Sequence, residues 1–159
     1  MTRDELLQTF DLSGRVAIVT GGSRGIGRAV AEGFAAVGAS VVIASRKAEA
    51  CEEAAMAITR AGGTALAVPT HVGDLDAIDH LVQRTVDELG GIDIVVNNAA
   101  NPLALPIGSI TPEAFAKSHD VNLRGPLFLV QRALPHLRAS DHAAIVRLVE
   151  AAETDRAQF

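Results

Sequence analysis

The chain has 159 residues, 48% hydrophobic and 21% charged, a balance that is ordinary for one globular domain. Its formal net charge of -5 argues against non-specific nucleic-acid binding, which requires a basic surface. The single cysteine, Cys51, forms no internal disulfide and is expected to be a small core residue. Because the sequence has no apolar run of about 18 residues and no signal peptide, we expect a soluble, cytoplasmic protein without a membrane partner.

The most informative stretch runs from Thr20 to Gly27 and reads Thr-Gly-Gly-Ser-Arg-Gly-Ile-Gly. It follows an apolar run at 15–20, typical of a strand buried on both faces, and precedes apolar residues at helical spacing. Glycines allow a ligand to approach the backbone, and the free N–H groups of a helix N-terminus attract phosphate. Arg24 in the first turn is unfavourable unless an anion shares the site. The alternative is a turn that only packs strand against helix, and we favour nucleotide binding.

The remainder of the chain repeats the alternation of strand and helix. Apolar strand patterns occupy 40–44, 64–68, 92–96 and 143–146, and helical patterns lie between them. This alternation predicts an α/β fold, a Rossmann-type doubly wound parallel sheet of about five strands in the order 3-2-1-4-5 with helices on both faces.

The residues that follow the second strand indicate which cofactor is bound. In a doubly wound sheet this strand ends beside the adenosine ribose, where an acidic residue binds a 2′-hydroxyl and a basic one accepts a 2′-phosphate. Here Ser45, Arg46 and Lys47 follow the strand, which favours NADP(H) over NAD(H). The alternative is a solvated helix start.

An acidic cluster with one histidine follows the third strand. Its members are Asp74, Asp76, Asp79 and His80. The spacing fits a helix start, where acidic side chains interact favourably with the helix dipole, better than it fits a metal site. We therefore predict no metal.

Three motifs together resemble the short-chain dehydrogenase/reductase family over about residues 10–146. They are the Gly-x-x-x-Gly-x-Gly turn after Thr20, the Asn-Asn-Ala-Ala run at 97–100, and the segment Val121-Asn122-Leu123-Arg124-Gly125. The resemblance implies hydride transfer between a nicotinamide and a carbonyl or alcohol carbon. It implies cofactor binding by Gly21, Ser23, Arg24, Gly25, Ile26, Gly27, Ser45, Arg46, His71, Val72, Asn98 and Ala99.

The chain departs from the family pattern at two residues within or next to these motifs. His71 stands where the family has an aspartate beside the adenine, and Ala100 replaces a glycine. Asn122 corresponds to the asparagine of the family's catalytic group, whose main chain anchors a water in the proton relay. Because Pro126 has no N–H, the Asn122 carbonyl loses its helical donor and is expected to be free to hold that water. The alternative is an ordinary asparagine at a proline kink.

The resemblance stops in the fifth strand, near Arg147. The chain contains no tyrosine, its lysines are Lys47 and Lys117, and no serine follows Ser140, so the family's catalytic serine and Tyr-x-x-x-Lys are missing. We predict a dinucleotide-binding domain at 1–146 and a non-family tail at 147–159. The expected function is that of a truncated or frame-shifted member, incomplete relative to the family, that binds NADP(H) but is catalytically incompetent.

Two alternatives remain for the function. The helix at 121–137 is expected to expose Leu127, Leu129, Val130 and Leu134, which favours an interaction module that forms a homo-oligomer or a mixed oligomer with an intact relative. The other alternative is a non-functional fragment that folds poorly. Titration with NADPH, with NADH as the control, separates these possibilities.

Overall fold

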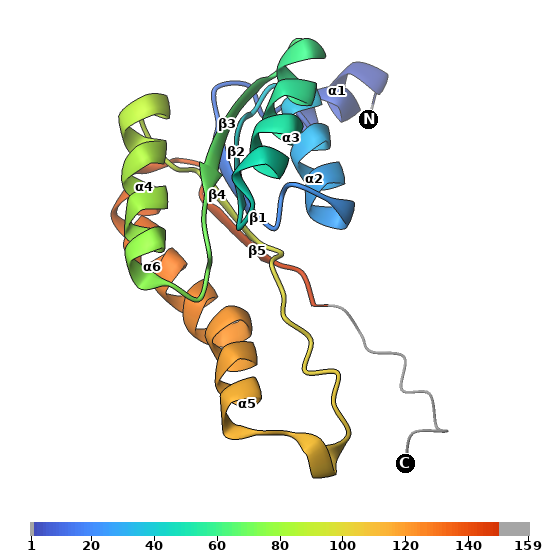
Figure 1. Ribbon diagram of the computed structural model, residues 1–159. Helices are drawn as coiled ribbons and strands as arrows, with labels where there is room; N and C mark the ends of the chain where they lie inside the picture. The colour runs from blue at the N-terminus through green and yellow to red at the C-terminus, as the bar shows by residue number, and fades with distance from the viewer. Residues whose placement is uncertain (1, 150–159) are drawn as a thin grey trace.

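A five-stranded parallel sheet forms the centre of the protein (Figure 1). The computed structural model describes residues 2–149. The strands follow the spatial order β3-β2-β1-β4-β5, and every neighbouring pair is parallel, which confirms the predicted topology. Their bounds are β1 Val16–Thr20, β2 Ser40–Ser45, β3 Thr64–Pro69, β4 Ile94–Asn97 and β5 Ala144–Arg147.

Helices cover both faces of the sheet. In Figure 1, α2 and α3 lie on one face, and α4 and α6 lie on the other. The helices are α1 Arg3–Thr9, α2 Gly25–Ala36, α3 Ala48–Arg60, α4 Leu75–Leu89, α5 Pro112–His119 and α6 Gly125–Ala139, with a 3-10 turn η1 at Ile107–Ser109 and a π-helical turn η2 at Asp120–Arg124.

Alternate residues of each strand build two separate hydrophobic layers. In β1, Ala17 and Val19 pack with residues of α2 and α3, whereas Ile18 packs with residues of α4 and α6. Cys51 of α3 is fully buried in the first layer, as predicted for a core residue, and this burial raises the pKa of its thiol. Because β1, β2 and β4 are covered on both sides, their sequences are continuous apolar runs.

The helix α6 differs from its prediction at two positions, because Val130, which was also expected to be exposed, is half-buried and packs against the second layer. Leu129 was expected to be exposed, but it is completely buried in the second layer with Ala133 and Leu137, because it lies on the side that faces the sheet. Leu127, two positions earlier, is 59% exposed, as predicted.

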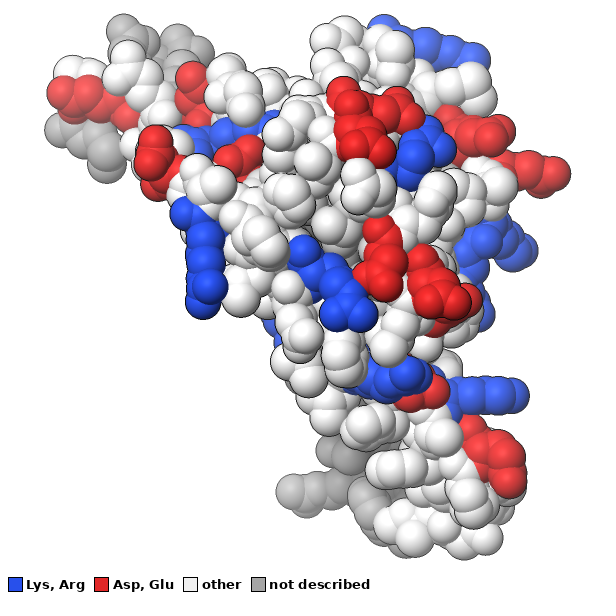
Figure 2. All heavy atoms as spheres, turned by 90° about the vertical axis from the view of Figure 1, so that its left-hand side faces the viewer, with Lys and Arg blue, Asp and Glu red and all other residues white. Residues whose placement is uncertain are grey.

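An ion pair joins α6 to α4 on the outer side of this layer. Nε of Arg132 donates to Oδ1 of Asp79 at 2.5 Å. On the molecular face drawn in Figure 2, basic and acidic side chains lie interspersed. None of the helices within residues 2–149 is both long and apolar enough to cross a membrane.

The segment that precedes α6 projects away from the sheet (Figure 1). Its helix α5 begins with Thr111 as the N-cap and Pro112 in the first turn, and Oγ1 of Thr111 accepts a hydrogen bond from the N–H of Ala114 at 3.1 Å. Ser118 is the residue that α5 buries. This helix is therefore held to the domain mainly through its junction with η2.

Candidate functional site

The glycine turn connects the end of β1 to the start of α2. Gly21 has a φ of 66°, a left-handed conformation that favours glycine, and its N–H donates to the carbonyl of Ala44 at 2.7 Å. A Cβ on Gly27 would overlap the carbonyl oxygen of Gly21 and the side-chain amide of Asn98. The N-terminus of α2 therefore lies directly against the strand ends, with its first N–H groups at the carboxyl edge of the sheet.

Asn98 and Thr20 fasten this turn to the end of β4. The Asn98 side-chain amide donates to the carbonyl oxygens of Thr20 at 2.9 Å and of Gly21 at 3.3 Å. The buried Thr20 hydroxyl accepts from the N–H groups of Asn98 at 3.0 Å and Ala99 at 3.1 Å, and donates to the carbonyl of Val96 at 3.2 Å. The side chain of Asn98 thus shapes the turn through contacts inside the protein.

A cavity of about 900 Å³ opens at the carboxyl ends of the strands, beside the glycine turn. Parallel sheets of this kind bind ligands at this edge, where the strand order reverses between β1 and β4. Eight predicted cofactor-binding residues line the cavity, namely Gly21, Ser23, Arg24, Ser45, Arg46, His71, Val72 and Ala99. The residues Gly25, Ile26, Gly27 and Asn98, and the predicted catalytic Asn122, are not among the lining residues.

Other lining residues had no recognisable signal in the sequence. Thr70 follows β3, Asn101 lies in the loop after β4, and Lys117 lies on α5. Lys117 lines the cavity although its helix α5 is far from the other lining residues in the sequence, and no local pattern encodes this long-range arrangement.

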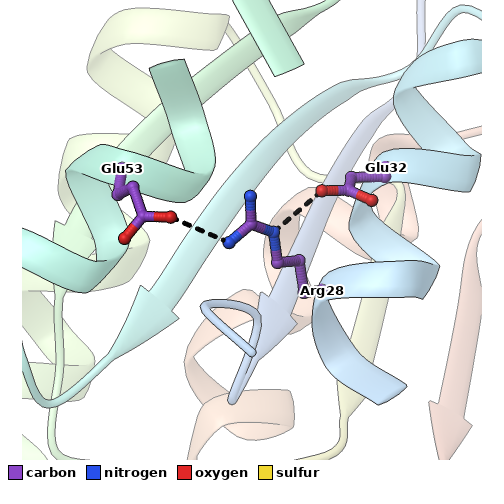
Figure 3. Close-up of polar contacts among 3 residues, drawn as sticks. All are labelled: Arg28, Glu32 and Glu53. Atoms are coloured by element: carbon purple, nitrogen blue, oxygen red, sulfur yellow. Dashed lines mark hydrogen bonds and ion pairs between the residues drawn. The ribbon is translucent and has the colours of Figure 1, made fainter. Parts of the chain in front are cut away.

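Four cations line the cavity wall, namely Arg24, Arg46, Lys47 and Lys117. Within residues 2–149, Arg24 and Arg46 take part in no ion pair. Arg28, one turn further along α2, differs because it donates to Glu32 at 2.8 Å and to Glu53 of α3 at 3.2 Å (Figure 3). These two hydrogen bonds raise the pKa of the Arg28 guanidinium. Arg28 therefore links α2 to α3, whereas Arg24 and Arg46 contribute uncompensated positive charge to the cavity.

The acidic cluster after β3 forms a helix cap, as its spacing predicts. Oδ1 of Asp74 accepts hydrogen bonds from the N–H groups of Asp76 at 3.0 Å and Ala77 at 3.3 Å at the start of α4. Asp79 pairs with Arg132. Asp74 and Asp79 therefore have structural contacts that do not require a metal.

Asn122 lies at the centre of a hydrogen-bonded junction in η2. Its side chain donates to the carbonyl of Asn101 at 2.9 Å and to the hydroxyl of Ser118 at 3.0 Å, and accepts from the Asn101 N–H at 2.8 Å. Its main-chain carbonyl, which we expected to be free for water, accepts from Nη2 of Arg147 at 2.5 Å. Pro126 removes the helical donor, and the guanidinium at the end of β5 takes that place.

The fold and site together define a class of protein. A doubly wound parallel sheet, a glycine turn that leads into a helix, and a basic cavity at the reversal of strand order are the features of a nucleotide-binding Rossmann domain. More specifically, the chain belongs to the short-chain dehydrogenase family, because the family model described as short chain dehydrogenase matches residues 15–155. The match enters the segment assigned to a tail, of which residues 150–159 lie outside the described residues.

Curated relatives show the same family resemblance over part of their length. The chain is 44% identical over 120 residues to galactitol 2-dehydrogenase of Agrobacterium fabrum, covering 76% of this chain and 46% of that protein. It is 40% identical over 127 residues to the short-chain dehydrogenase/reductase SDRA of Arabidopsis thaliana, covering 79% and 50%. The chain therefore spans about half the length of these relatives.

Solved structures of related enzymes share the fold. A dehydrogenase/reductase from Sinorhizobium meliloti 1021 superimposes with a TM-score of 0.85 at 35% identity, covering 91% of this chain and 57% of that one. A metagenomic short-chain oxidoreductase in complex with NADP gives a TM-score of 0.83 at 32% identity, covering 91% and 66%. A 7α-hydroxysteroid dehydrogenase complexed with NADH gives 0.86 at 27% identity, covering 94% and 57%.

Proposed function

We propose that this polypeptide binds NADP(H) through the adenosine-phosphate half of the dinucleotide, in preference to NAD(H). The observation that carries the proposal is the pair Arg24 and Arg46, two guanidinium groups without an ion-pair partner in the described chain, on one cavity beside the glycine turn. Arg46 follows β2, the place where a basic residue accepts a 2′-phosphate in this fold. Because relatives are known with NADP and with NADH, the preference rests on these two residues of this chain.

We further propose that these 159 residues do not by themselves catalyse the family's hydride transfer. The sequence contains no tyrosine to transfer the proton, and the Asn122 carbonyl is occupied by Arg147. General acid-base assistance contributes about 10²–10⁴ in rate, and holding both reactants in register contributes roughly 7–11 kcal/mol, so we expect the loss of the first and of much of the second to abolish useful turnover. Oxidation of NADPH with a panel of aldehydes and ketones tests this proposal, and a rate above that of protein-free buffer would refute it.

Calorimetric titration of NADPH and NADH into the wild type and into two arginine variants, Arg46→Gln and Arg28→Gln, tests the cofactor preference. We expect the wild type to bind NADPH at least about tenfold more tightly than NADH, because a hydrogen bond to a charged group contributes about 1.5–3 kcal/mol. Arg46→Gln removes the cation at the end of β2, so the two affinities should converge. Arg28→Gln is the matched control, because its guanidinium is already held by Glu32 and Glu53 and the ratio should remain that of the wild type.

The two parts of the cofactor proposal fail separately. If the wild type binds neither dinucleotide, cofactor binding itself is refuted. If it binds NADPH and NADH equally, only the preference is refuted.

A second candidate function is association through the helical segment that runs from α5 to α6. Phe115 of α5, Leu123 of η2 and Leu127 of α6 are 57%, 49% and 59% exposed, and Leu123 and Leu127 lie four residues apart. Exposed apolar side chains at this spacing form a stripe on a helix, and such a stripe favours contact with a second helix. Self-association, or association with an intact relative, follows from this surface.

A further inference from the structure

One face of the helical segment formed by α5 and η2 lines the cavity. Lys117, Asp120 and Val121 are all lining residues, and their spacings of three and four residues place them on one side of a helix. The helical backbone continues through the junction of the two elements, since His119 and Asp120 both have α-helical φ and ψ. Among the lining residues of this face, Lys117 is the cation.

Ser118 fixes the rotation of this face. Its side chain is buried, and its hydroxyl donates to the carbonyl of Asn101 at 2.9 Å and accepts from the side-chain amide of Asn122 at 3.0 Å. Asn101 also lines the cavity, in the loop after β4. Because Ser118 directly follows Lys117 in the chain, these bonds hold the base of the lysine side chain beside the loop after β4.

The same helical segment also contacts the loop after β3. A Cβ on Gly73 would lie 3.5 Å from the Cβ of Asp120, and a Cβ on Gly125 would overlap the carbonyl of Val72. The helix α6, which continues this segment, covers the face of the sheet opposite to α2 and α3. Lys117 therefore belongs to the cavity wall that faces the N-terminus of α2.

The ammonium group of Lys117 is available to an anion. Within residues 2–149 it takes part in no ion pair, not even with Glu113 one turn earlier. Asp120, the one carboxylate among the described lining residues, pairs with Arg124 at 3.4 Å. The other three lining cations belong to the opposite wall and are Arg24, Arg46 and Lys47.

A dinucleotide in this fold places its pyrophosphate between the two walls. The free N–H groups and the dipole of α2 attract the pyrophosphate at the point where the strand order reverses between β1 and β4. The 2′-phosphate belongs further along the sheet, at the end of β2 beside Arg46. Because Lys117 is held beside the loop after β4, the pyrophosphate is the nearer of the two anionic groups.

We propose that Lys117 binds the pyrophosphate from the side opposite the glycine turn and thereby docks α5 onto the domain when a dinucleotide is bound. This proposal rests on the proposed binding of NADP(H). Of its own residues α5 buries Ser118, so the contact with the ligand adds to a sparsely packed helix. NADPH and NADH share the pyrophosphate, so the contribution of Lys117 is the same for both, in contrast to that of Arg46.

Calorimetric titration of NADPH and NADH into the wild type and three variants tests the contact. Lys117→Gln should weaken the binding of both dinucleotides by about fivefold or more and leave their ratio unchanged, because one ion pair at contact distance in water corresponds to a factor of about five. Lys117→Arg keeps the charge and should retain most of the affinity. Arg138→Gln is the matched control, because it removes an exposed cation of α6 outside the cavity and should bind both dinucleotides like the wild type.

Hydrogen exchange followed by mass spectrometry distinguishes a direct contact from a long-range effect of charge. Saturating NADPH should slow the exchange of the α5 amides in the wild type, because a ligand that holds α5 reduces its local opening. This protection should be lost in Lys117→Gln, even at an NADPH concentration that saturates the variant. Lys117 is exposed, so neither substitution removes a core contact.

The outcomes separate this inference from the proposed function. A wild type that binds neither dinucleotide refutes the proposed function, and this inference with it. If the wild type binds NADPH, unchanged affinities in Lys117→Gln, a loss confined to NADPH, or α5 amides that do not respond to NADPH would overturn this inference alone. Equal weakening of NADPH and NADH, together with loss of the α5 protection, supports it.

Discussion

Gly27 is the residue whose size is most tightly limited in the glycine turn. A Cβ there would overlap the Gly21 carbonyl and the Asn98 amide, the group that fastens the turn to the end of β4. We therefore predict that Gly27→Ala lowers the free energy of unfolding by about 1–3 kcal/mol, the usual cost of an overpacked site, and weakens NADPH binding because the α2 N-terminus shifts. Urea unfolding and calorimetric titration measure the two effects.

Gly33 is the matched control, because it lies in the same helix and a Cβ added there would meet nothing within 4 Å in the described chain. Gly33→Ala should raise the free energy of unfolding by about 0.5–1 kcal/mol through helix propensity. Equal effects of the two substitutions would show that the close approach at Gly27 has no energetic importance.

Individual site residues were predictable where their role depends on neighbours in the sequence. Arg24 was predicted because it lies at the start of a helix, and Arg46 because it follows the end of a strand. Both line the cavity. Lys117 and Arg147 reach the site from distant segments, and no local pattern indicates such contacts. The Asn122 carbonyl was expected to be free for a water, but the guanidinium of Arg147, which comes from β5, donates to it.

At the scale of elements, α4 and α5 have similar caps but different packing. Asp74 caps α4, which buries Ile78 and Leu81 against the sheet, whereas Thr111 caps α5, whose one buried residue is Ser118. We predict that Asp74→Ala lowers global stability by about 1 kcal/mol, the typical worth of an N-cap. Thr111→Ala should accelerate hydrogen exchange within α5 and leave the global unfolding midpoint nearly unchanged, because α5 can open locally.

Hydrogen exchange followed by mass spectrometry, together with urea unfolding, checks both substitutions. A shift of the global midpoint by Thr111→Ala as large as that of Asp74→Ala would mean that α5 unfolds with the core. It would also mean that the packing of α5 contributes more than its exposure indicates.

Long periodic elements were predicted well, and a short one was missed. No element was predicted before the apolar run at 15–20, yet α1 occupies Arg3–Thr9. Seven residues are too few for an apolar stripe to stand out. The available signal was a capping box, since the N–H of Thr2 donates to Glu5 at 2.7 Å and the N–H of Glu5 donates to the Thr2 hydroxyl at 3.2 Å.

At the scale of the whole molecule, the order of the sheet was predictable from general rules, but the exposure of α6 was not. Right-handed crossovers and a glycine turn at β1 permit few arrangements other than β3-β2-β1-β4-β5. Which side of α6 faces the sheet depends on how the π-helical turn η2 rotates the helix after α5. The sequence pattern does not reveal that rotation, and Leu129 was therefore assigned to the wrong side.

The exposed surfaces of the described chain lead to a prediction about self-association. One is the helical stripe of Phe115, Leu123 and Leu127, and the other is the outer edge of β5, where Ile145 is 53% exposed. We predict that the helical stripe mediates association, because its exposed apolar side chains can pack against a second copy. Leu127→Lys should then shift the protein toward monomer in sedimentation velocity experiments, while Ile145→Lys should not.

The reverse result would assign association to the strand edge, which exposes unpaired main-chain groups. A wild type that stays monomeric at every concentration would exclude both surfaces and refute the second candidate function, at least for association between identical copies.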